Sequence, residues 1–275
     1  MVEALPGFDP RATYDEASSD YEDASRDFWQ YLMFRTVDRL HLLPGERVLD
    51  VPCGTGPALL QAAERVGPTG SVIGLDYAEK ILAIARNKVR AAGLATVEID
   101  QADMTTIARP EQPFDAILCV LGFFFFDDMP GLVRSLADLL RQDGHGRLAV
   151  TVFGERFFDP MRDVFVDAVR AVAPEFKVVQ PWCRTDDESV LRTVFEDAGL
   201  ADVTIETDDD ALPLPSADDW WRIVMGSGLR RTAVGLGPAA AAAVRARCTD
   251  YIERHGVREV VSRSRYAIVT LRRDA

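Results

Sequence analysis

One nine-residue segment constrains the fold of this chain more than any other. Residues 48–56 read Val-Leu-Asp-Val-Pro-Cys-Gly-Thr-Gly: a short apolar strand, an acid at its end and a turn with two glycines, followed by an apolar helical pattern. Gly54 and Gly56 let the backbone turn sharply and approach a ligand closely, because they carry no side chain. Asp76 follows Gly56 by twenty residues, at the end of the next predicted strand. A carboxylate there can accept hydrogen bonds from a ribose diol, so the pattern predicts an adenosine-containing cofactor.

The rest of the chain fits an α/β sheet around that segment. Helical patterns separate the predicted strands, which are residues 47–51, 71–75, 96–99, 114–121, 147–153, 203–207 and 266–271. Such alternation predicts a mostly parallel sheet covered by helices on both faces. Further helices are predicted at residues 158–172, 189–198, 216–225 and 239–255. We expect a single domain over residues 1–275, with an N-terminal helical lid (1–45), a cofactor-binding core (46–154) and the remaining strands with helical cap insertions (155–275).

Composition excludes several classes of protein. The longest strongly apolar run, Ala116 to Phe126, is shorter than the ~18 residues that a membrane span needs. The N-terminus lacks a basic segment followed by an apolar one, so no secretion signal is expected. The four cysteines have no paired CxxC spacing, which favours reduced thiols in the cytoplasm and argues against a metal site. The net charge of −13 argues against nucleic acid as a partner.

The charge is unevenly distributed along the chain. Residues 1–27 carry eight acids against two arginines, whereas residues 222–273 carry eleven arginines against three acids. We expect these two segments to attract each other within the fold. A sharper alternative is that some of the arginines meet an anionic group on a substrate.

The residues of the glycine turn discriminate between cofactors. A dinucleotide places its pyrophosphate at the helix N-terminus, usually through G-x-G-x-x-G, but the third glycine position here is Leu59. Asp50 stands directly before the turn, where a carboxylate repels a diphosphate and suits the ammonium and sulfonium charges of S-adenosylmethionine (SAM). SAM is therefore favoured over NAD(P), and an NAD(P)-dependent oxidoreductase is the less favoured alternative.

Five sequence blocks in a fixed order carry a family resemblance. They are LDVPCGTG (49–56), GLDYAEKILAIAR (74–86), DQADM (100–104), FDAILCVLGFFFFDD (114–128) and LLRQDGHGRLAVTVFG (139–154). With these blocks the chain resembles class I SAM-dependent methyltransferases of the UbiE-like type, which implies a Rossmann-like, seven-stranded, mostly parallel sheet whose last strand is antiparallel. One position departs from the family: its first loop glycine is Pro52, which removes a backbone donor and stiffens the loop.

The resemblance also implies a set of cofactor-binding residues. The methionine part is expected at the glycine loop and at the exit of the fourth strand, and the ribose and adenine at the exits of the second and third strands. The expected residues are Asp50, Cys53, Gly54, Gly56 and Cys119 for the methionine part, Asp76 for the ribose, Tyr77, Asp103 and Met104 for the adenine, and Tyr21 from the N-terminal segment. The product of the cofactor would be S-adenosylhomocysteine (SAH).

Methyl transfer leaves little trace in a sequence, because the sulfonium of SAM already activates the methyl group. A base is needed only where the nucleophile must lose a proton. His41 and His145 precede parallel strands and are expected at the far edge of the sheet, while His255 precedes the antiparallel strand and is expected at the active edge. The candidate bases are His255, Tyr14 and Asp127, with Tyr21 and Asp128 as rivals.

The acceptor pocket is expected from aromatic and apolar side chains outside the cofactor core. The candidates are Phe28, Trp29, Phe153, Phe157, Trp220, Trp221 and Met225, with core packing as the alternative for each one. As a set they suggest a small, apolar quinone-like or polyketide-like acceptor methylated on carbon or oxygen, and loss of residues 1–30 should then abolish turnover. A SAM-binding homologue that acts as a cyclase or pericyclase is the main alternative. The protein is expected to be a monomer or homodimer.

Overall fold

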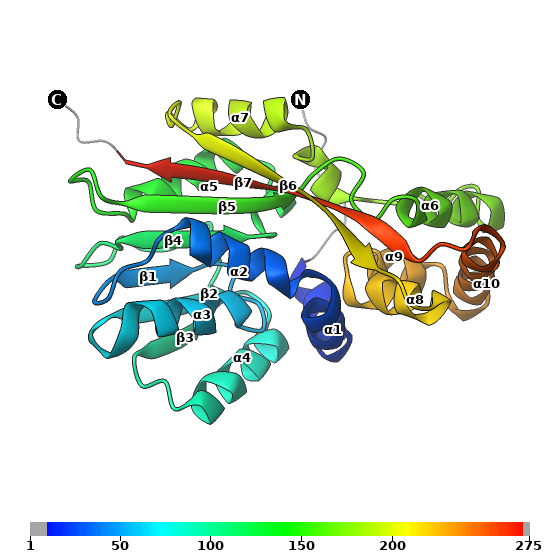
Figure 1. Cartoon of the computed structure of the whole chain (residues 1–275), viewed down its shortest axis with the longest axis horizontal. Coiled ribbons are helices and arrows are strands. Elements are labelled where there is room, and N and C mark those ends of the chain that lie inside the picture. Colours follow the sequence, from blue (N-terminus) through cyan, green and yellow to red (C-terminus); the bar gives the residue numbers. More distant parts are fainter. Residues whose placement is uncertain (1–9, 272–275) are drawn as a thin grey trace.

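A computed structural model describes residues 10–271 of the chain. Its centre is a seven-stranded sheet with the strand order β3-β2-β1-β4-β5-β7-β6 (Figure 1). The strands are β1 (Arg47–Asp50), β2 (Ser71–Asp76), β3 (Val97–Gln101), β4 (Ala116–Val120), β5 (Arg147–Phe153), β6 (Thr204–Pro213) and β7 (Glu259–Thr270). Neighbouring strands from β3 to β5 pair in parallel, whereas β7 is antiparallel to both β5 and β6. The predicted mostly parallel Rossmann-like sheet with an antiparallel last strand is confirmed.

Helices cover both faces of this sheet (Figure 1). One face carries α2, α3 and α4, and the other carries α5 and α7. The helices are α1 (Pro10–Ala24), the π-helical η1 (Ser25–Trp29), α2 (Gln30–Arg39), α3 (Pro57–Val66), η2 (Gly67–Thr69), α4 (Glu79–Ala92), η3 (Phe123–Phe125), α5 (Met129–Asp138), α6 (Met161–Val172), η4 (Pro181–Arg184), α7 (Glu188–Asp197), α8 (Ala217–Gly226), α9 (Arg230–Gly235) and α10 (Pro238–His255). Of the helices in residues 10–271, none is both long and apolar enough to cross a bilayer.

The last two strands are longer than their apolar cores predicted. Residues 209–213 of β6 pair with residues 259–263 of β7 beyond the end of β5, whose last residue pairs with Ser264. Three consecutive acids (208–210) lead into the extension of β6, and Glu259, Ser262 and Arg263 interrupt the apolar residues of the extension of β7, so neither has the apolar run that marks a buried strand. The two-stranded ribbon projects from the carboxyl edge of the sheet, and α6, α8, α9 and α10 gather around its end (Figure 1).

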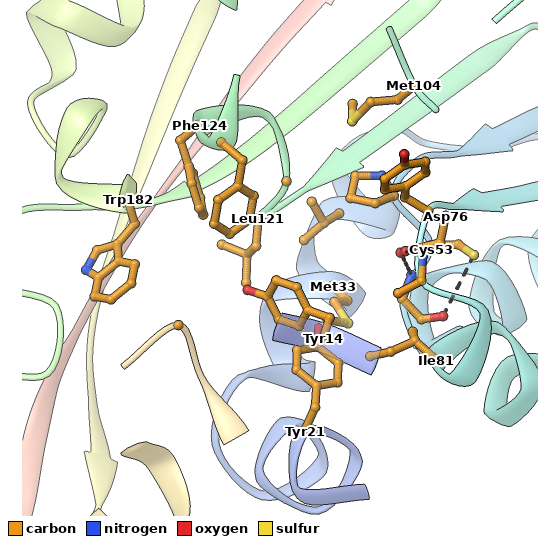
Figure 2. Close-up of a pocket in the computed structure, with 18 of the residues that line it drawn as sticks. Tyr14, Tyr21, Met33, Cys53, Asp76, Ile81, Met104, Leu121, Phe124 and Trp182 are labelled. Atoms are coloured by element: carbon orange, nitrogen blue, oxygen red, sulfur yellow. Dashed lines mark hydrogen bonds between the residues drawn. The ribbon is translucent and has the colours of Figure 1, made fainter. Parts of the chain in front are cut away.

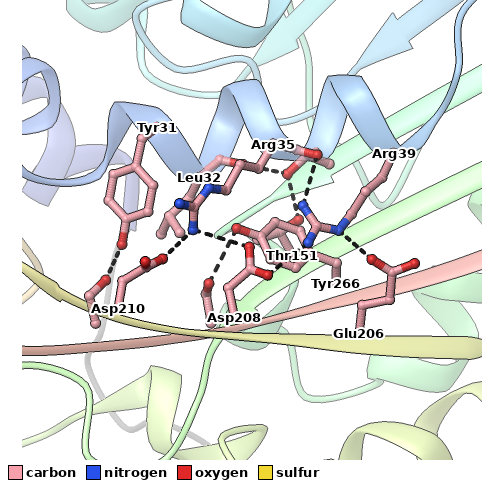
Figure 3. Close-up of polar contacts among 12 residues, drawn as sticks. Tyr31, Leu32, Arg35, Arg39, Thr151, Glu206, Asp208, Asp210 and Tyr266 are labelled. Carbon is pink, nitrogen blue, oxygen red and sulfur yellow. Dashed lines mark hydrogen bonds and ion pairs between the residues drawn. The ribbon is translucent and has the colours of Figure 1, made fainter.

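A group of ion pairs fixes α2 on the sheet (Figure 3). The Arg35 guanidinium donates to Asp208 at 3.1 Å, and Arg39 donates to Glu206 at 2.8 Å and to Asp208 at 2.9 Å. The Arg39 guanidinium also lies 3.8 Å from the centre of the Tyr266 ring. These arginines therefore bind α2 to β6 and β7 through charge and ring contacts.

Buried hydroxyls add a second attachment on the same helix. The Thr36 and Thr151 hydroxyls lie 2.7 Å apart and both are buried, which ties α2 to β5 (Figure 3). Within the predicted N-terminal lid, α2 is therefore part of the layer that covers the sheet. The helix that lies over the carboxyl edge is α1.

Candidate active site

A pocket with a volume of about 210 Å³ lies at the carboxyl ends of β1, β2 and β4. Its floor is the glycine loop after β1 and the exit of β4, and α1 covers it with Tyr14 and Tyr21 (Figure 2). The carboxyl edge is where open parallel sheets bind ligands, because the chain diverges to either face at that point. The pocket therefore lies where the sequence predicted the cofactor.

The two loop glycines are favoured for different reasons. Gly54 has a φ of +55°, and a Cβ there would lie 3.6 Å from the Tyr21 hydroxyl of α1. Gly56 has a φ of +87°, and a Cβ there would lie 3.2 Å from the Cβ of Ala85 in α4. Gly54 is therefore favoured by its positive φ, since the contact with Tyr21 would be an ordinary one, whereas Gly56 also lets α4 pack closely against the start of α3.

Pro52, the departure from the family pattern, has a complementary partner. It faces Gly122 at the exit of β4, and a Cβ on Gly122 would overlap the proline ring. The neighbouring Leu121 has a φ of +55°, an unusual conformation for leucine, and lines the pocket. A glycine at the facing strand exit therefore accommodates the proline and couples the loop to β4.

Asp50 is the most unusual charge in the pocket. Its side chain is 1% exposed, and neither carboxylate oxygen has a hydrogen-bond partner among residues 10–271. Burial, followed by the nearby charge of Asp76, raises the pKa of Asp50 well above its ordinary value; the Leu59 amide, too far away for a full hydrogen bond, lowers it only in part. A buried carboxylate without partners is costly unless a cation is supplied. Asp50 therefore indicates that the pocket receives a positively charged group.

The other two expected acids are already oriented by the backbone. Asp76 accepts hydrogen bonds from the amides of Gly54 and Ala78, each at 3.0 Å, although burial still raises its pKa. Asp103 accepts at Oδ1 from the amide of Thr105 at 2.9 Å and from its hydroxyl at 2.7 Å. These contacts fix both carboxylates at the exits of β2 and β3, with both residues lining the pocket.

Seven aromatic side chains form a closed circuit around the rest of the pocket, here called the aromatic collar. Successive ring centres are 4.8 to 6.5 Å apart, which is the normal range for interacting aromatic pairs. The circuit runs through Tyr14, Tyr21, Trp29, Phe158, Phe153, Phe124 and Phe125 and returns to Tyr14. All seven line the pocket. The collar joins α1 and η1 to the exits of β4 and β5.

Ion pairs and hydrogen bonds hold α1 over this pocket. The Asp15 carboxylate of α1 accepts from the amide of Lys80 at 2.8 Å, at the start of α4. On the opposite side, Arg230 of α9 donates to Asp20 at 2.5 Å. The expected attraction between the acidic N-terminal segment and the arginine-rich late segment is confirmed for this pair. The lid therefore spans from the cofactor end of the pocket to the late helices.

Most of the predicted site residues meet in this pocket. Those that line it are Tyr14, Tyr21, Trp29, Asp50, Cys53, Gly54, Asp76, Tyr77, Asp103, Met104 and Phe153. Gly56 and Cys119 lie behind its wall, the first at the start of α3 and the second fully buried in β4. Their neighbours Val120 and Leu121 form the wall itself.

The remaining aromatic candidates pack around the pocket without lining it. Phe157 is buried against Phe153 and Phe158, and Trp220 is buried against Phe158 and Phe165. The others outside the lining are Phe28, Trp221 and Met225. They support the collar or the late helices, which is the packing alternative weighed for each aromatic residue.

The structure separates the candidate bases. Tyr14 lies in the pocket, where burial raises the pKa of its phenol far above the ordinary value, as it does for Tyr21. His255 is exposed, stacks on Tyr251 with ring centres 4.1 Å apart, and lies outside the pocket at the end of α10. His255 lies beyond the carboxyl edge of the sheet, as expected, but it is at the far end of the projecting ribbon and outside the pocket.

The two aspartates after β4 also lie outside the pocket lining. Asp127 is mostly exposed and pairs with Arg184 at 3.7 Å. Asp128 caps α5 by accepting from the amide of Gly131 at 2.8 Å. Within residues 10–271, histidine, cysteine and carboxylate side chains form no cluster of three that could hold a metal ion.

The structure adds pocket residues that the sequence analysis did not single out for this role. The main additions are Arg11, Met33, Ile81, Phe124, Phe125, Trp182, Ser227 and Gly228. The phenylalanine run at residues 123–126, directly after a buried strand, was a usable signal for Phe124 and Phe125. Trp182 and Gly228 had no such signal, because both stand in irregular segments between elements.

Comparison with known proteins agrees with the fold and with a methyltransferase domain. A family model described as a methyltransferase domain matches residues 48–144. The chain is 33% identical over 166 residues to nocamycin O-methyltransferase of Saccharothrix syringae, covering 59% of each chain. It is 35% identical over 138 residues to the aklanonic acid methyltransferase DauC of Streptomyces sp. (strain C5), covering 50% of this chain and 62% of that protein. These matches span about six-tenths of the length of the two relatives.

More distant similarities extend further along the chain. Demethylmenaquinone methyltransferase of Geobacillus kaustophilus is 27% identical over 210 residues, covering 70% of this chain and 88% of that protein. Among solved structures, YcgJ of Bacillus subtilis superposes with a TM-score of 0.59 at 19% identity, covering 89% of this chain and 99% of YcgJ. The [4+2]-cyclase SpnF superposes with a TM-score of 0.56 at 19% identity over 94% of each chain.

The ordered sequence blocks, the glycine loop with its acid and the matched methyltransferase domain lead to the same assignment. The fold of YcgJ, shared over most of both chains, is consistent with it. The methyltransferase domain of residues 48–144 and the similarity to named methyltransferases support a class I SAM-dependent methyltransferase of the UbiE-like type.

Proposed function

We propose that this protein transfers the methyl group of SAM to a carbon or oxygen atom of a small, largely apolar metabolite of quinone-like or polyketide-like type. The observation that carries the proposal is the unpaired, buried Asp50 carboxylate in the same pocket as the aromatic collar. One end of the pocket is suited to bind a cation, and the other end is suited to bind an apolar ring system. The relatives named for nocamycin, aklanonic acid and demethylmenaquinone support this class of acceptor.

The residues of the pocket fit the donor. Asp50 and the glycine loop would hold the cationic methionine part, Asp76 the ribose, and Tyr77, Asp103 and Met104 the adenine. When bound, SAM supplies a methyl group activated by its sulfonium. The task of the chain is then to hold the acceptor in line and to exclude water, which the lid helix α1 and the collar can do.

The collar tyrosines suit hydrogen bonding better than proton removal. Burial raises the pKa of both Tyr14 and Tyr21, so each stays a neutral phenol near neutral pH. A neutral phenol can donate a hydrogen bond to an acceptor oxygen and so orient it. Tyr14 is therefore proposed as an orienting donor, and His255 has no role in this mechanism.

The first test is calorimetric titration of the purified protein with SAM, SAH and NADH in parallel. Binding of the two adenosyl compounds, lost in Asp76→Ala and retained in the exposed control Asp138→Ala, supports the proposed cofactor site. Acceptors are then screened by product mass for the gain of one methyl group. Binding of NADH in place of SAM would refute the proposal.

A second candidate function is a cyclisation without methyl transfer. It is supported by the fold shared with the [4+2]-cyclase SpnF over 94% of each chain and by a pocket lining that, within residues 10–271, carries no histidine or lysine to act as a base. In that case SAM binds as before, but the product has the same mass as its substrate. The mass of the product therefore separates the two functions.

A further inference from the structure

The pocket has two chemically different ends (Figure 2). Cys53, Asp76 and Met104 lie at one end, and Trp182 lies at the other, with Tyr14, Leu121 and Phe124 between them. The charged lining residues Arg11, Asp50, Asp76 and Asp103 belong to the glycine loop, the exits of β2 and β3, and the part of α1 that stacks on Tyr77. If the proposed function holds, the Trp182 end is the part of the pocket that receives the acceptor.

Trp182 lies directly on the backbone of Gly228. It is 5% exposed and lines the pocket from η4. A Cβ on Gly228 would lie 2.6 Å from Cζ3 of the indole, 3.4 Å from Cε3 and 3.5 Å from Cη2. Such a distance requires the ring to move, and the open space beside this buried ring is the pocket that it lines, so the movement shortens the compartment. The absence of a side chain at residue 228 therefore sets the position of the indole.

The segment that carries Trp182 is fixed on both sides. Arg184, whose side chain is 8% exposed, donates to the carbonyl oxygen of Phe124 in the collar at 3.2 Å. Two residues further along, the carbonyl oxygen of Asp186 accepts from the buried Arg265 of β7. These contacts hold the indole at a fixed distance from the collar.

We infer that Trp182, seated on Gly228, is the end wall of the acceptor compartment and limits the length of the flat, uncharged aromatic acceptor that the collar admits. Aromatic side chains around the compartment offer stacking and edge contacts to a fused ring system. Ser227, the polar side chain at this end, has its hydroxyl within 3.3 Å of the Leu229 amide. We therefore expect this wall to discriminate between acceptors by their number of fused rings.

The test compares two fused-ring probes, 1-naphthol with two rings and 1-hydroxyanthraquinone with three. Each is titrated calorimetrically into the parent protein and its variants, with and without saturating SAH. In Gly228→Ala the displaced indole should weaken the three-ring probe at least ~10-fold more than the two-ring probe. In Trp182→Ala the preference should shift in the opposite direction, with Trp182→Phe intermediate. Thermal melts confirm that each variant is folded.

Gly235→Ala is the matched control. Its new Cβ would also meet an aromatic ring, that of Phe176 at 3.0 Å, but Phe176 does not line the pocket. This control should leave the ratio of the two affinities unchanged.

Three outcomes would overturn the end wall while SAH still binds. In the first, neither Gly228→Ala nor Trp182→Ala changes the ratio of the affinities for the two probes. In the second, one of the fused-ring probes fails to bind the parent protein. In the third, phenyltrimethylammonium binds more tightly than 1-naphthol. The last would make the collar a cation cage. Failure of the parent protein to bind SAH refutes the proposed function instead, so the two failures are distinguishable.

Discussion

Replacing Asp50 by asparagine should change stability and ligand affinity in opposite directions. The substitution keeps the shape of the side chain and removes a charge that is 1% exposed and lacks a hydrogen-bond partner within residues 10–271. An unsatisfied buried polar group costs about 1–3 kcal/mol and a charged one more, so exchanging the carboxylate for an amide should relieve about 2 kcal/mol. The ligand-free variant should therefore be about 2 kcal/mol more stable than the parent, which raises Tm by roughly 5 °C for a chain of this size.

The same substitution removes the partner of the ligand's positive charge. A loss of about 2 kcal/mol in that interaction weakens SAH binding about 30-fold. At a ligand concentration of about 100 times the parent's Kd, SAH stabilises the parent by about 2.7 kcal/mol but the variant by only about 0.9 kcal/mol. The two proteins should then have nearly equal stability with SAH, although the variant is the more stable one without it.

Thermal unfolding followed by circular dichroism, with and without SAH, measures both effects, and calorimetry gives the affinity directly. Asp138→Asn is the control, because Asp138 is exposed at the end of α5 and lies outside the pocket; it should stay within about 0.5 kcal/mol of the parent in both states. A ligand-free Asp50→Asn variant that is less stable than the parent and binds SAH equally well would refute the reasoning. Asp50 would then be a structural residue.

Three further predictions use other parts of the site. Burial raises the folded-state pKa of Asp50 above its ordinary value of 3.8, so the parent should lose stability relative to Asp50→Asn as the pH rises above 3.8, and the two proteins should be equally stable in acid. Parallel thermal melts at several pH values measure the difference in stability. A difference that grows toward acid pH contradicts the assignment. Gly122→Ala should lower Tm by roughly 5 °C, since the new methyl group overlaps Pro52 and overpacking costs about 2 kcal/mol, and an unchanged melt would show that the loop yields freely. His255→Ala should leave kcat/KM for the identified acceptor unchanged, because the ring is exposed outside the pocket, and a tenfold loss would return it to the mechanism.

Some structural expectations followed from local pattern alone. The alternation of strand-like and helix-like hydrophobic patterns predicted the sheet, because the period of each pattern shows which face of an element is buried. The strands were placed within a few residues at β1 to β5, where the apolar runs are continuous. The length of the ribbon formed by β6 and β7 was underestimated, because charged and polar residues interrupt the apolar pattern of its outer half, which is held by cross-strand pairing.

The glycine loop shows how far sequence order can reach into a site. Gly54, Asp50 and Asp76 lie on successive strand exits, so the parallel topology alone brings them to one edge of the sheet. Their grouping in one pocket agrees with that argument. The sequence, however, does not show that the Asp50 carboxylate lacks a hydrogen-bond partner within residues 10–271, because this depends on how the surrounding residues pack.

By itself, therefore, the sequence determined the fold class, the resemblance to SAM-dependent methyltransferases and the edge of the sheet where the cofactor is expected. Only the tertiary structure decided which aromatic side chains face the pocket, because Phe153 and Phe157 carry the same apolar signal and differ only in the direction in which the chain turns them. It also placed Trp182 on Gly228. These two residues are 46 positions apart in the sequence, and the hydrophobic pattern of neither segment predicts this contact. Local patterns record burial, whereas the choice between packing a core and lining a cavity is made by distant elements that meet only in the folded chain.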